Sequence, residues 1–246
     1  MITSKQNALI KEIRSLADKK FRDRLNLFVV EGIKPVNEAV GLSMPVKVII
    51  CTEKAVQSLC VAGVDVQVVT DEVFKSVSEE VSPQGALAVV EKPQTPVQAP
   101  KGSCLLLDGV SDPANVGAII RTAAASGYND VYLTETCADA YSQKAVRTSM
   151  SGIFHVRVMR GKIQDLLACI DLPICVADMN GENVFEYSAK TDVCLVIGNE
   201  GHGVSEEIKK IANFTVKIPM ENGMESLNAG VSAGILMYNL KNRKQK

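Results

Sequence analysis

Short apolar runs alternate with amphipathic segments along almost the whole chain. Runs bounded by Gly, Pro or Asp have the length of buried strands, and the segments between them carry helical spacing or helix-start residues. We expect strands at 27–32, 46–52, 64–70, 86–92, 104–110, 130–136, 154–160, 173–179, 194–201 and 214–220. We expect helices at 4–26, 33–40, 53–59, 71–78, 162–170, 205–212 and 227–243. Within 113–127 we expect a loop that leads into an Ala-rich helix ending at Gly127, and within 139–152 a polar stretch that contains a helix. The alternation predicts an α/β protein.

One interruption divides this pattern. Residues 92–102 read KPQTPVQAPKG and hold three prolines, which is typical of a linker. The sequence therefore predicts a small α/β domain at 1–92, a proline-rich linker at 93–102 and a larger α/β domain at 103–246. Repeated strand–helix units in the larger domain predict a mainly parallel sheet.

Composition narrows the class of protein. The 246 residues are 46% hydrophobic and 22% charged, as in soluble globular proteins. Apolar runs near 18 residues are missing and the first residues lack the apolar core of a signal peptide, so we expect neither a membrane span nor secretion. Seven scattered cysteines and two histidines fit neither a disulfide scaffold nor a metal site. A cytoplasmic location is the expectation.

Charge is unevenly distributed. Residues 1–34 carry eight Lys or Arg and four Asp or Glu, a net charge of +4, so the rest of the chain carries −5. A basic first segment suits a polyanionic partner, because Lys and Arg displace counterions from phosphates. A solvated helix face explains the same charges equally well. The candidate contacts are Lys19, Lys20, Arg22 and Arg24.

Three loops in the larger domain are unusually polar and glycine-rich. They are LDGVSDPANVGAIIRTA at 107–123, VIGNEGHGVS at 196–205 and IPMENGMESLNAG at 218–230. Each could be structural on its own: a proline turn, a tight glycine turn or a helix N-cap. Parallel sheets bind ligands in loops at the carboxyl ends of their strands, so three such loops in one domain favour a binding site. The spacing of a dinucleotide fingerprint and a phosphate-loop lysine are both missing.

Together and in this order, the three loops resemble the three signature motifs of the SpoU/TrmH-type RNA ribose 2′-O-methyltransferases of the SPOUT superfamily. Residues 1–92 are similar to the RNA substrate-binding domain that precedes the catalytic domain in many members. The resemblance implies a trefoil-knot domain that binds S-adenosylmethionine in the knot and forms homodimers. It implies methyl transfer to a ribose 2′-hydroxyl of RNA, with ribosomal RNA favoured over transfer RNA.

The resemblance also assigns residues. Main-chain groups of the second and third motifs hold the cofactor in this family, and apolar side chains wall it. By position, the cofactor-binding residues are Ile197, Gly198, Ile218, Met220 and Leu227. By motif, the catalytic polar set is Asn115, Arg121, Glu200, Ser226 and Asn228.

Arg121 is the group that the family implicates in activating the hydroxyl. A guanidinium normally stays protonated and makes a poor base. We therefore expect Arg121 to bind the substrate phosphate and stabilise the developing alkoxide, with proton acceptance left open. Glu200 is expected to orient Arg121 or a loop, Asn115 and Asn228 to hold the loops and the ribose, and Ser226 to cap the last helix.

Two other classes of function stay open. One is an RNA-binding protein that kept the fold without the chemistry, which the intact polar set disfavours. The other is a nucleotide-dependent α/β enzyme of another kind, which the missing phosphate-loop signatures disfavour.

Overall fold

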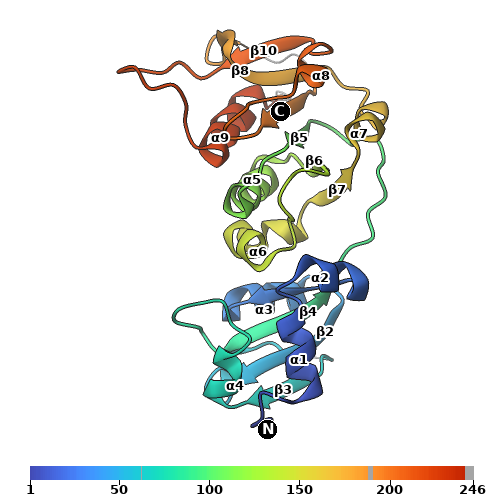
Figure 1. Cartoon of the computed structure of the whole chain (residues 1–246), viewed down its shortest axis with the longest axis vertical. Coiled ribbons are helices and arrows are strands. Elements are labelled where there is room, and N and C mark those ends of the chain that lie inside the picture. The colour runs from blue at the N-terminus through green and yellow to red at the C-terminus, as the bar shows by residue number, and fades with distance from the viewer. Residues whose placement is uncertain (62, 188–190, 242–246) are drawn as a thin grey trace. The chain divides into compact units, whose positions relative to one another are not determined.

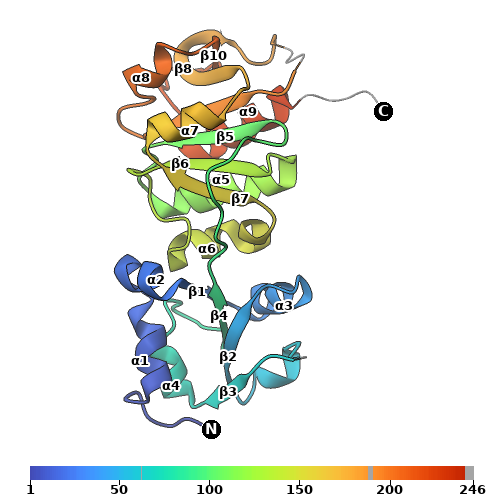
Figure 2. The ribbon, with the colours of Figure 1, turned by 90° about the vertical axis from the view of Figure 1, so that its right-hand side faces the viewer.

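The computed structural model describes residues 1–61, 63–187 and 191–241. The chain forms two compact units (Figures 1 and 2). The first comprises Met1–Gln94 and Tyr141–Phe154, and the second comprises Thr95–Ala140 and His155–Lys246. The segment between β4 and β5, all of which is described, contains neither helix nor strand. A domain boundary at 93–102 remains a proposal.

The first unit is built on a four-stranded sheet with the strand order β1-β4-β2-β3. β4 is antiparallel to both of its neighbours, and β2 is parallel to β3. The strands are β1 (Leu27–Glu31), β2 (Val46–Thr52), β3 (Val66–Val69) and β4 (Ala86–Glu91). The helices are α1 (Ala8–Ser15), α2 (Lys19–Leu25), α3 (Ile33–Gly41), η1 (Val56–Ser58), α4 (Asp71–Lys75), α6 (Gln143–Ser149) and η2 (Met150–Phe154).

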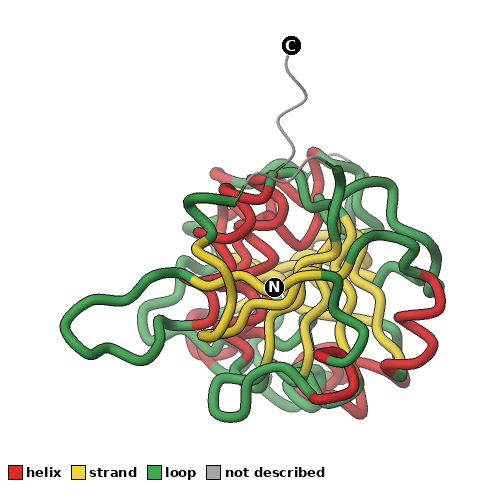
Figure 3. Tube along the Cα trace, turned by 90° about the horizontal axis from the view of Figure 1, so that it is seen from above, coloured by secondary structure: helices red, strands yellow, loops and turns green. Residues whose placement is uncertain are grey.

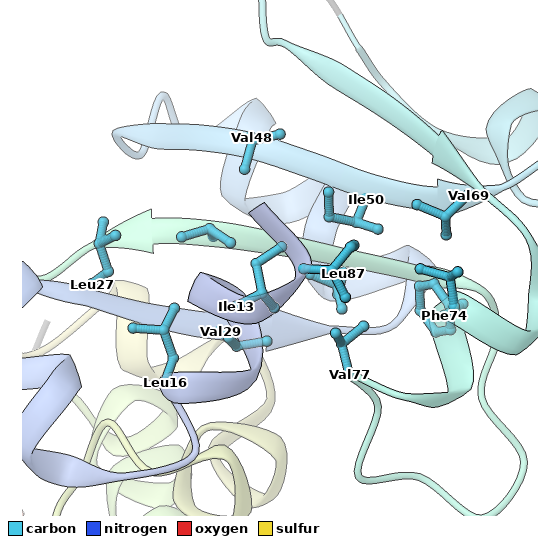
Figure 4. Packing of buried hydrophobic residues seen from close by; sticks show 13 residues of the cluster. Ile13, Leu16, Leu27, Val29, Val48, Ile50, Val69, Phe74, Val77 and Leu87 are labelled. Carbon is cyan, nitrogen blue, oxygen red and sulfur yellow. The ribbon is translucent and has the colours of Figure 1, made fainter. Parts of the chain in front are cut away.

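The core of this unit lies between the sheet and the helices α1 and α4. Figure 4 shows Ile13 and Leu16 of the α1 region packed over Val29 and Leu87 of the sheet. Phe74 of α4 joins the same cluster and is fully buried. Burial of such side chains is the main source of stability in a domain of this size.

Two predicted helices of this unit are wrong in detail. The helix expected at 4–26 is two helices, because Asp18 accepts a hydrogen bond from Lys20 N and starts α2 anew. Asn7 caps α1 by accepting a hydrogen bond from Leu9 N. The helix expected at 53–59 is a single 3₁₀ turn. There the Asn37 side chain donates to Ser58 O and accepts from Cys60 N, so tertiary contacts replace helical hydrogen bonds.

The second unit holds a six-stranded sheet with the order β10-β8-β9-β5-β6-β7. All its strand pairings are parallel, which confirms the predicted sheet type. The strands are β5 (Cys104–Asp108), β6 (Asp130–Thr134), β7 (Arg157–Gly161), β8 (Ile174–Asn183), β9 (Cys194–Gly198) and β10 (Phe214–Lys217). The helices are α5 (Pro113–Ser126), α7 (Ile163–Cys169), α8 (Glu206–Lys209) and α9 (Ala229–Leu240). Every helix that the structure describes is too short or too polar to traverse a bilayer.

The strand order reverses in the middle of this sheet. The chain runs outward through β5, β6 and β7, and then builds β8, β9 and β10 on the other side of β5. β5 and β9 are therefore neighbours, and Asp108 at the end of β5 pairs with Gly198 at the end of β9. Ligands bind at such switch points in open parallel sheets.

Helix α9 packs on α5 through small residues. A methyl group added at Gly230 would lie 3.1 Å from Ala118 Cβ, and one added at Gly234 would lie 3.5 Å from Thr122 Cγ2. This close packing brings the start of α9 beside the start of α5. The helix was expected at 227–243, but Asn228 caps it, it ends at Leu240, and residues 242–243 lie outside the described part of the chain.

Candidate active site

The turn after β5 is held by its own polar residues. Asp112 accepts a hydrogen bond from Ala114 N at 2.9 Å and so caps α5, with Pro113 at the first helical position. Gly109 has a φ of +71°, and its N–H donates to Thr134 Oγ1 at 3.0 Å. The turn is therefore fixed to the end of β6.

The turn after β9 needs glycine where it closes. Asn199 and Gly203 exchange two main-chain hydrogen bonds of 2.9 and 3.0 Å, which fold 198–203 into a tight hairpin. A Cβ at Gly198 would lie 2.2 Å from the carbonyl carbon of Gly203. Gly203 itself has a φ of +70°, a conformation that favours glycine.

Gly198→Ala is expected to open this hairpin and to destabilise the fold by about 1–3 kcal/mol, because the added methyl group meets backbone that cannot move aside cheaply. Amide hydrogen exchange at Asn199 and Gly203 should accelerate. Gly201→Ala is the matched control, since its Cβ would come no closer than 3.6 Å to a neighbour. Equal exchange rates in the two variants would contradict the packing argument.

Glu200 joins the turn after β9 to the start of α5. Its Oε2 accepts hydrogen bonds from Ser111 N and Ser111 Oγ at 3.1 and 3.0 Å. Its Oε1 accepts from Asp112 N at 3.3 Å and from Asn115 Nδ2 at 2.8 Å. Both carboxylate oxygens are thus occupied by donors of a single segment.

These bonds change the acidity of Glu200. Partial burial by itself raises the pKa of the carboxyl, but the hydrogen bonds from Asn115, Ser111 and Asp112 outweigh it and lower the pKa to about 2. Glu200 is therefore a fixed anion at neutral pH and serves as a hydrogen-bond acceptor rather than as a proton donor.

Asn115 extends the link to the third loop. Its Oδ1 accepts a hydrogen bond from Asn228 Nδ2 at 2.8 Å, and the side chain is only 7% exposed. Asn228 Oδ1 accepts in turn from Gly230 N at 2.9 Å and from Val231 N at 3.3 Å, which caps α9. A continuous chain of side chains, Glu200–Asn115–Asn228, thus connects all three loops, as expected for parts of one site.

Arg121 and Ser226 lie outside this chain of hydrogen bonds. Arg121 is an exposed residue of α5, and none of the described residues accepts a hydrogen bond from its guanidinium. Of the two partners expected for Glu200, Arg121 or a loop, the structure shows the loop: Glu200 accepts hydrogen bonds from the turn at Ser111. Ser226 is exposed, and the expectation that it caps the last helix is wrong, because Asn228 stands next to the first free N–H groups of α9.

The cofactor candidates fall into two groups. Ile197 and Gly198 end the central strand β9, and Ile197 is 4% exposed. Ile218, Met220 and Leu227 lie on the loop between β10 and α9, which projects from the rest of its unit in Figures 1 and 3. Ile218 and Met220 are half-buried and Leu227 is 38% exposed, so this loop carries apolar side chains that the described part of the chain leaves uncovered.

The basic residues of α2 differ in how accessible they are to an RNA phosphate. Arg22 is 3% exposed, and its Nη1 donates to Leu16 O and Ala17 O at 2.7 Å each, so it ties the end of α1 to α2. Lys19 forms an ion pair of 2.5 Å with Asp23. Lys20 and Arg24 are exposed. We therefore remove Arg22 from the proposed contacts and retain Lys20 and Arg24.

Two residues of the site were missed in the sequence. Ser111 gives two hydrogen bonds to Glu200, and Asn199 contacts both turns. Both stand inside the quoted motifs, next to residues that were selected. Ser and Asn also favour turns for local reasons, and this common role hides their longer contacts in the sequence.

Comparison with known proteins gives this site a family. A family model described as the SpoU rRNA Methylase family matches residues 102–238, and the MRM3-like substrate binding domain matches residues 7–88. The 23S rRNA (guanosine(2553)-2′-O)-methyltransferase RlmP of Bacillus subtilis is 31% identical over 245 residues, or 98% of both chains.

Solved structures agree. An AdoMet-bound rRNA methyltransferase from Sinorhizobium meliloti has a TM-score of 0.87 at 26% identity and covers 100% of this chain and 98% of its own. The SpoU methyltransferase AviRb from Streptomyces viridochromogenes, in complex with AdoMet, has a TM-score of 0.83 at 26% identity over 95% and 97% of the two chains. The resemblance seen in the three motifs is confirmed, and the chain belongs to the SpoU rRNA Methylase family.

Proposed function

We propose that this protein transfers a methyl group from S-adenosylmethionine to a ribose 2′-hydroxyl of RNA, with ribosomal RNA as the substrate. Membership of the SpoU family and a 23S rRNA 2′-O-methyltransferase relative over almost the full length of both chains support this function. Within the molecule, the strongest support for this function is the hydrogen-bonded chain Glu200–Asn115–Asn228, which joins the three motif loops.

The residues present fit the proposed cofactor. Gly198 allows main chain to approach a flat ligand closely, and Ile218, Met220 and Leu227 offer partly exposed apolar surface for the adenine and methionine parts. S-adenosylmethionine would supply an electrophilic methyl group on a sulfonium. We propose Ile197, Gly198, Ile218, Met220 and Leu227 as the residues that hold it.

The protein must orient the ribose hydroxyl and accommodate the charge that develops on its oxygen. Arg121 is exposed and carries a guanidinium, so it can bind an RNA phosphate and stabilise an alkoxide. Asn115 and Asn228 have their amides engaged with each other and with Glu200 and α9, which suits them to holding the loops. Ser226, exposed just before α9, is left as a proposed polar contact to the substrate.

We also propose a homodimer, a trefoil knot around the cofactor loops and a cytoplasmic location. Val231 and Tyr238 are 52% and 50% exposed and lie seven positions apart on α9, which puts them on one face of the helix. An apolar face of this kind supports packing against a second copy. Sedimentation velocity of the full chain tests the dimer, and a monomer at micromolar concentration would exclude it.

Calorimetry with S-adenosylhomocysteine tests the proposed function. We expect one site per chain with a dissociation constant in the micromolar range. Methylation assays with ribosomal and transfer RNA then separate the two substrate classes. Failure to bind the product cofactor at any accessible concentration would remove the proposed function, and preference for transfer RNA would correct the substrate.

Removing the charges of Lys20 and Arg24 together is expected to weaken RNA binding and to reduce the slope of log K against log salt by about 1–2, because each phosphate contact releases counterions. Lys19→Ala is the comparison on the same helix: Asp23 pairs with that ammonium and with Lys92, so a smaller change in slope than in the double variant is expected. Filter binding from 50 to 300 mM salt, about the range over which such slopes are resolved, provides the measurement. An unchanged slope in the double variant would show that Lys20 and Arg24 belong to a solvated helix face and do not contact RNA.

A further inference from the structure

Asn199 lies between Gly198 and Glu200 but belongs to neither proposed set of site residues. Its side chain makes three hydrogen bonds. Oδ1 accepts from Gly201 N at 2.9 Å and from His202 N at 3.1 Å, and Nδ2 donates to Gly109 O at 2.8 Å. The carboxamide therefore uses both of its ends.

The oxygen and the nitrogen of the Asn199 carboxamide contact different parts of the chain. The Oδ1 contacts stay within the turn after β9 and form an Asx turn, which is a local device. The Nδ2 contact reaches across 90 positions of sequence to the turn after β5. It is thus a direct tie between the first and second motif loops.

The target of this tie is itself well fixed. Gly109 N donates to Thr134 Oγ1, so its peptide groups are held from β6 on one side and by Asn199 on the other. Asp108 Oδ2 also accepts from Ser205 N at 2.7 Å, which anchors the far end of the turn after β9 to β5. The turn is therefore held at both ends against a rigid part of the sheet.

We propose that Asn199 is a positioning residue for cofactor binding. Its amide sets the spacing between Gly198, whose main chain is proposed to contact the cofactor, and the turn that carries Ser111 and Asn115. Glu200 follows directly in the chain, so the same tie keeps its carboxylate within reach of Ser111. The inference rests on the proposed function, because it assigns Asn199 to the site that holds S-adenosylmethionine.

Two variants distinguish the contribution of the Nδ2 hydrogen bond from that of the Oδ1 hydrogen bonds. Asn199→Ala removes all three hydrogen bonds. Asn199→Ser keeps an oxygen that can accept from Gly201 N, as serine does in similar turns, but it cannot reach Gly109 O. If the tie positions the site, both variants should bind S-adenosylhomocysteine about 5- to 10-fold more weakly, the usual effect of losing one hydrogen bond.

The experiment is calorimetry on the full chain, together with steady-state kinetics and thermal melts. KM for S-adenosylmethionine should rise in both variants while KM for RNA stays at the wild-type value. Tm should fall more in Asn199→Ala, which loses three hydrogen bonds, than in Asn199→Ser, so the difference between the two KM values is the deciding readout. A merely structural role would lower Tm without this split. Asn129→Ala is the matched control, because Asn129 is exposed at the amino end of β6, away from the three loops.

Wild-type cofactor affinity in either variant would overturn the inference. Wild-type affinity in Asn199→Ser would show that the Oδ1 hydrogen bonds within the turn are sufficient. Wild-type affinity in Asn199→Ala would show that neither the Oδ1 nor the Nδ2 hydrogen bonds are needed for cofactor binding. Equal losses for cofactor and RNA would also overturn it. A wild-type protein that fails to bind S-adenosylhomocysteine would instead remove the proposed function, so the two failures are distinguishable.

Discussion

Arg121→Ala is expected to lower the rate of methyl transfer by about 10²–10³-fold while S-adenosylhomocysteine affinity stays within about twofold of wild type. Arg121 is exposed on α5 and donates no hydrogen bond to any described residue, so its removal leaves the loop network intact. The loss should therefore appear in catalysis and RNA positioning. Single-turnover methylation with saturating cofactor measures it.

Arg121→Lys is the control for this prediction. It keeps a positive charge but loses the forked donors that bind phosphate in a bidentate manner, so an intermediate rate is expected. A pH–rate profile of both variants shows whether proton acceptance belongs to Arg121. Full activity in Arg121→Ala would contradict the assigned role.

Glu200→Gln is expected to weaken cofactor binding about 10-fold or more and to reduce methyl transfer further. The replacement puts an NH₂ group where a carboxylate oxygen accepts two hydrogen bonds, so donors at Ser111, or at Asp112 and Asn115, face another donor. Since Glu200 is exposed, the cost in unfolding free energy should be small, about 1 kcal/mol.

Acid should narrow the stability difference between wild type and Glu200→Gln. The pKa of Glu200 is lowered in the folded protein, to about 2 from 4.5. A carboxyl with a depressed folded pKa contributes stability that is present above its unfolded pKa and lost as pH falls toward the folded value. Urea unfolding between pH 7 and about pH 3 should show the two curves converging below about pH 4.5. A constant gap would show that Glu200 acts through packing instead.

Elements with local start and stop residues could be predicted from the sequence. The Ala-rich helix of 113–127 ends at Gly127 as expected, because that glycine takes the left-handed conformation. It begins at Pro113 without the expected loop, because Asp112 caps it and Pro113 suits the first turn. The parallel sheet followed from alternation alone. These features depend on neighbours in the chain, which the sequence displays directly.

Features that depend on side-chain contacts formed in the folded chain could not be predicted in this way. The break between α1 and α2 is supported by Arg22, whose buried guanidinium binds the carbonyls of Leu16 and Ala17. In a sequence, Arg22 looks like one more basic surface residue. The choice of Asn228 over Ser226 as cap reflects its bond to Asn115, 113 positions away.

The candidate site shows the same division. Motif resemblance selected Asn115, Glu200 and Asn228, and the structure brings these three together. It did not select Asn199 or Ser111, whose contacts with Gly109 and Glu200 become visible in three dimensions. The family pattern names residue types at positions, whereas hydrogen bonds between turns require the folded sheet.

The position of the transferred methyl group is the most direct test of this account. The full chain is incubated with ribosomal RNA and S-adenosylmethionine labelled in its methyl group, and the RNA is then hydrolysed with alkali. Alkaline cleavage needs a free 2′-hydroxyl, so a ribose 2′-O-methyl group leaves the label in an alkali-resistant dinucleotide, which is the predicted result. Label in mononucleotides would place the methyl group on a base and would contradict the assignment, as would unlabelled RNA.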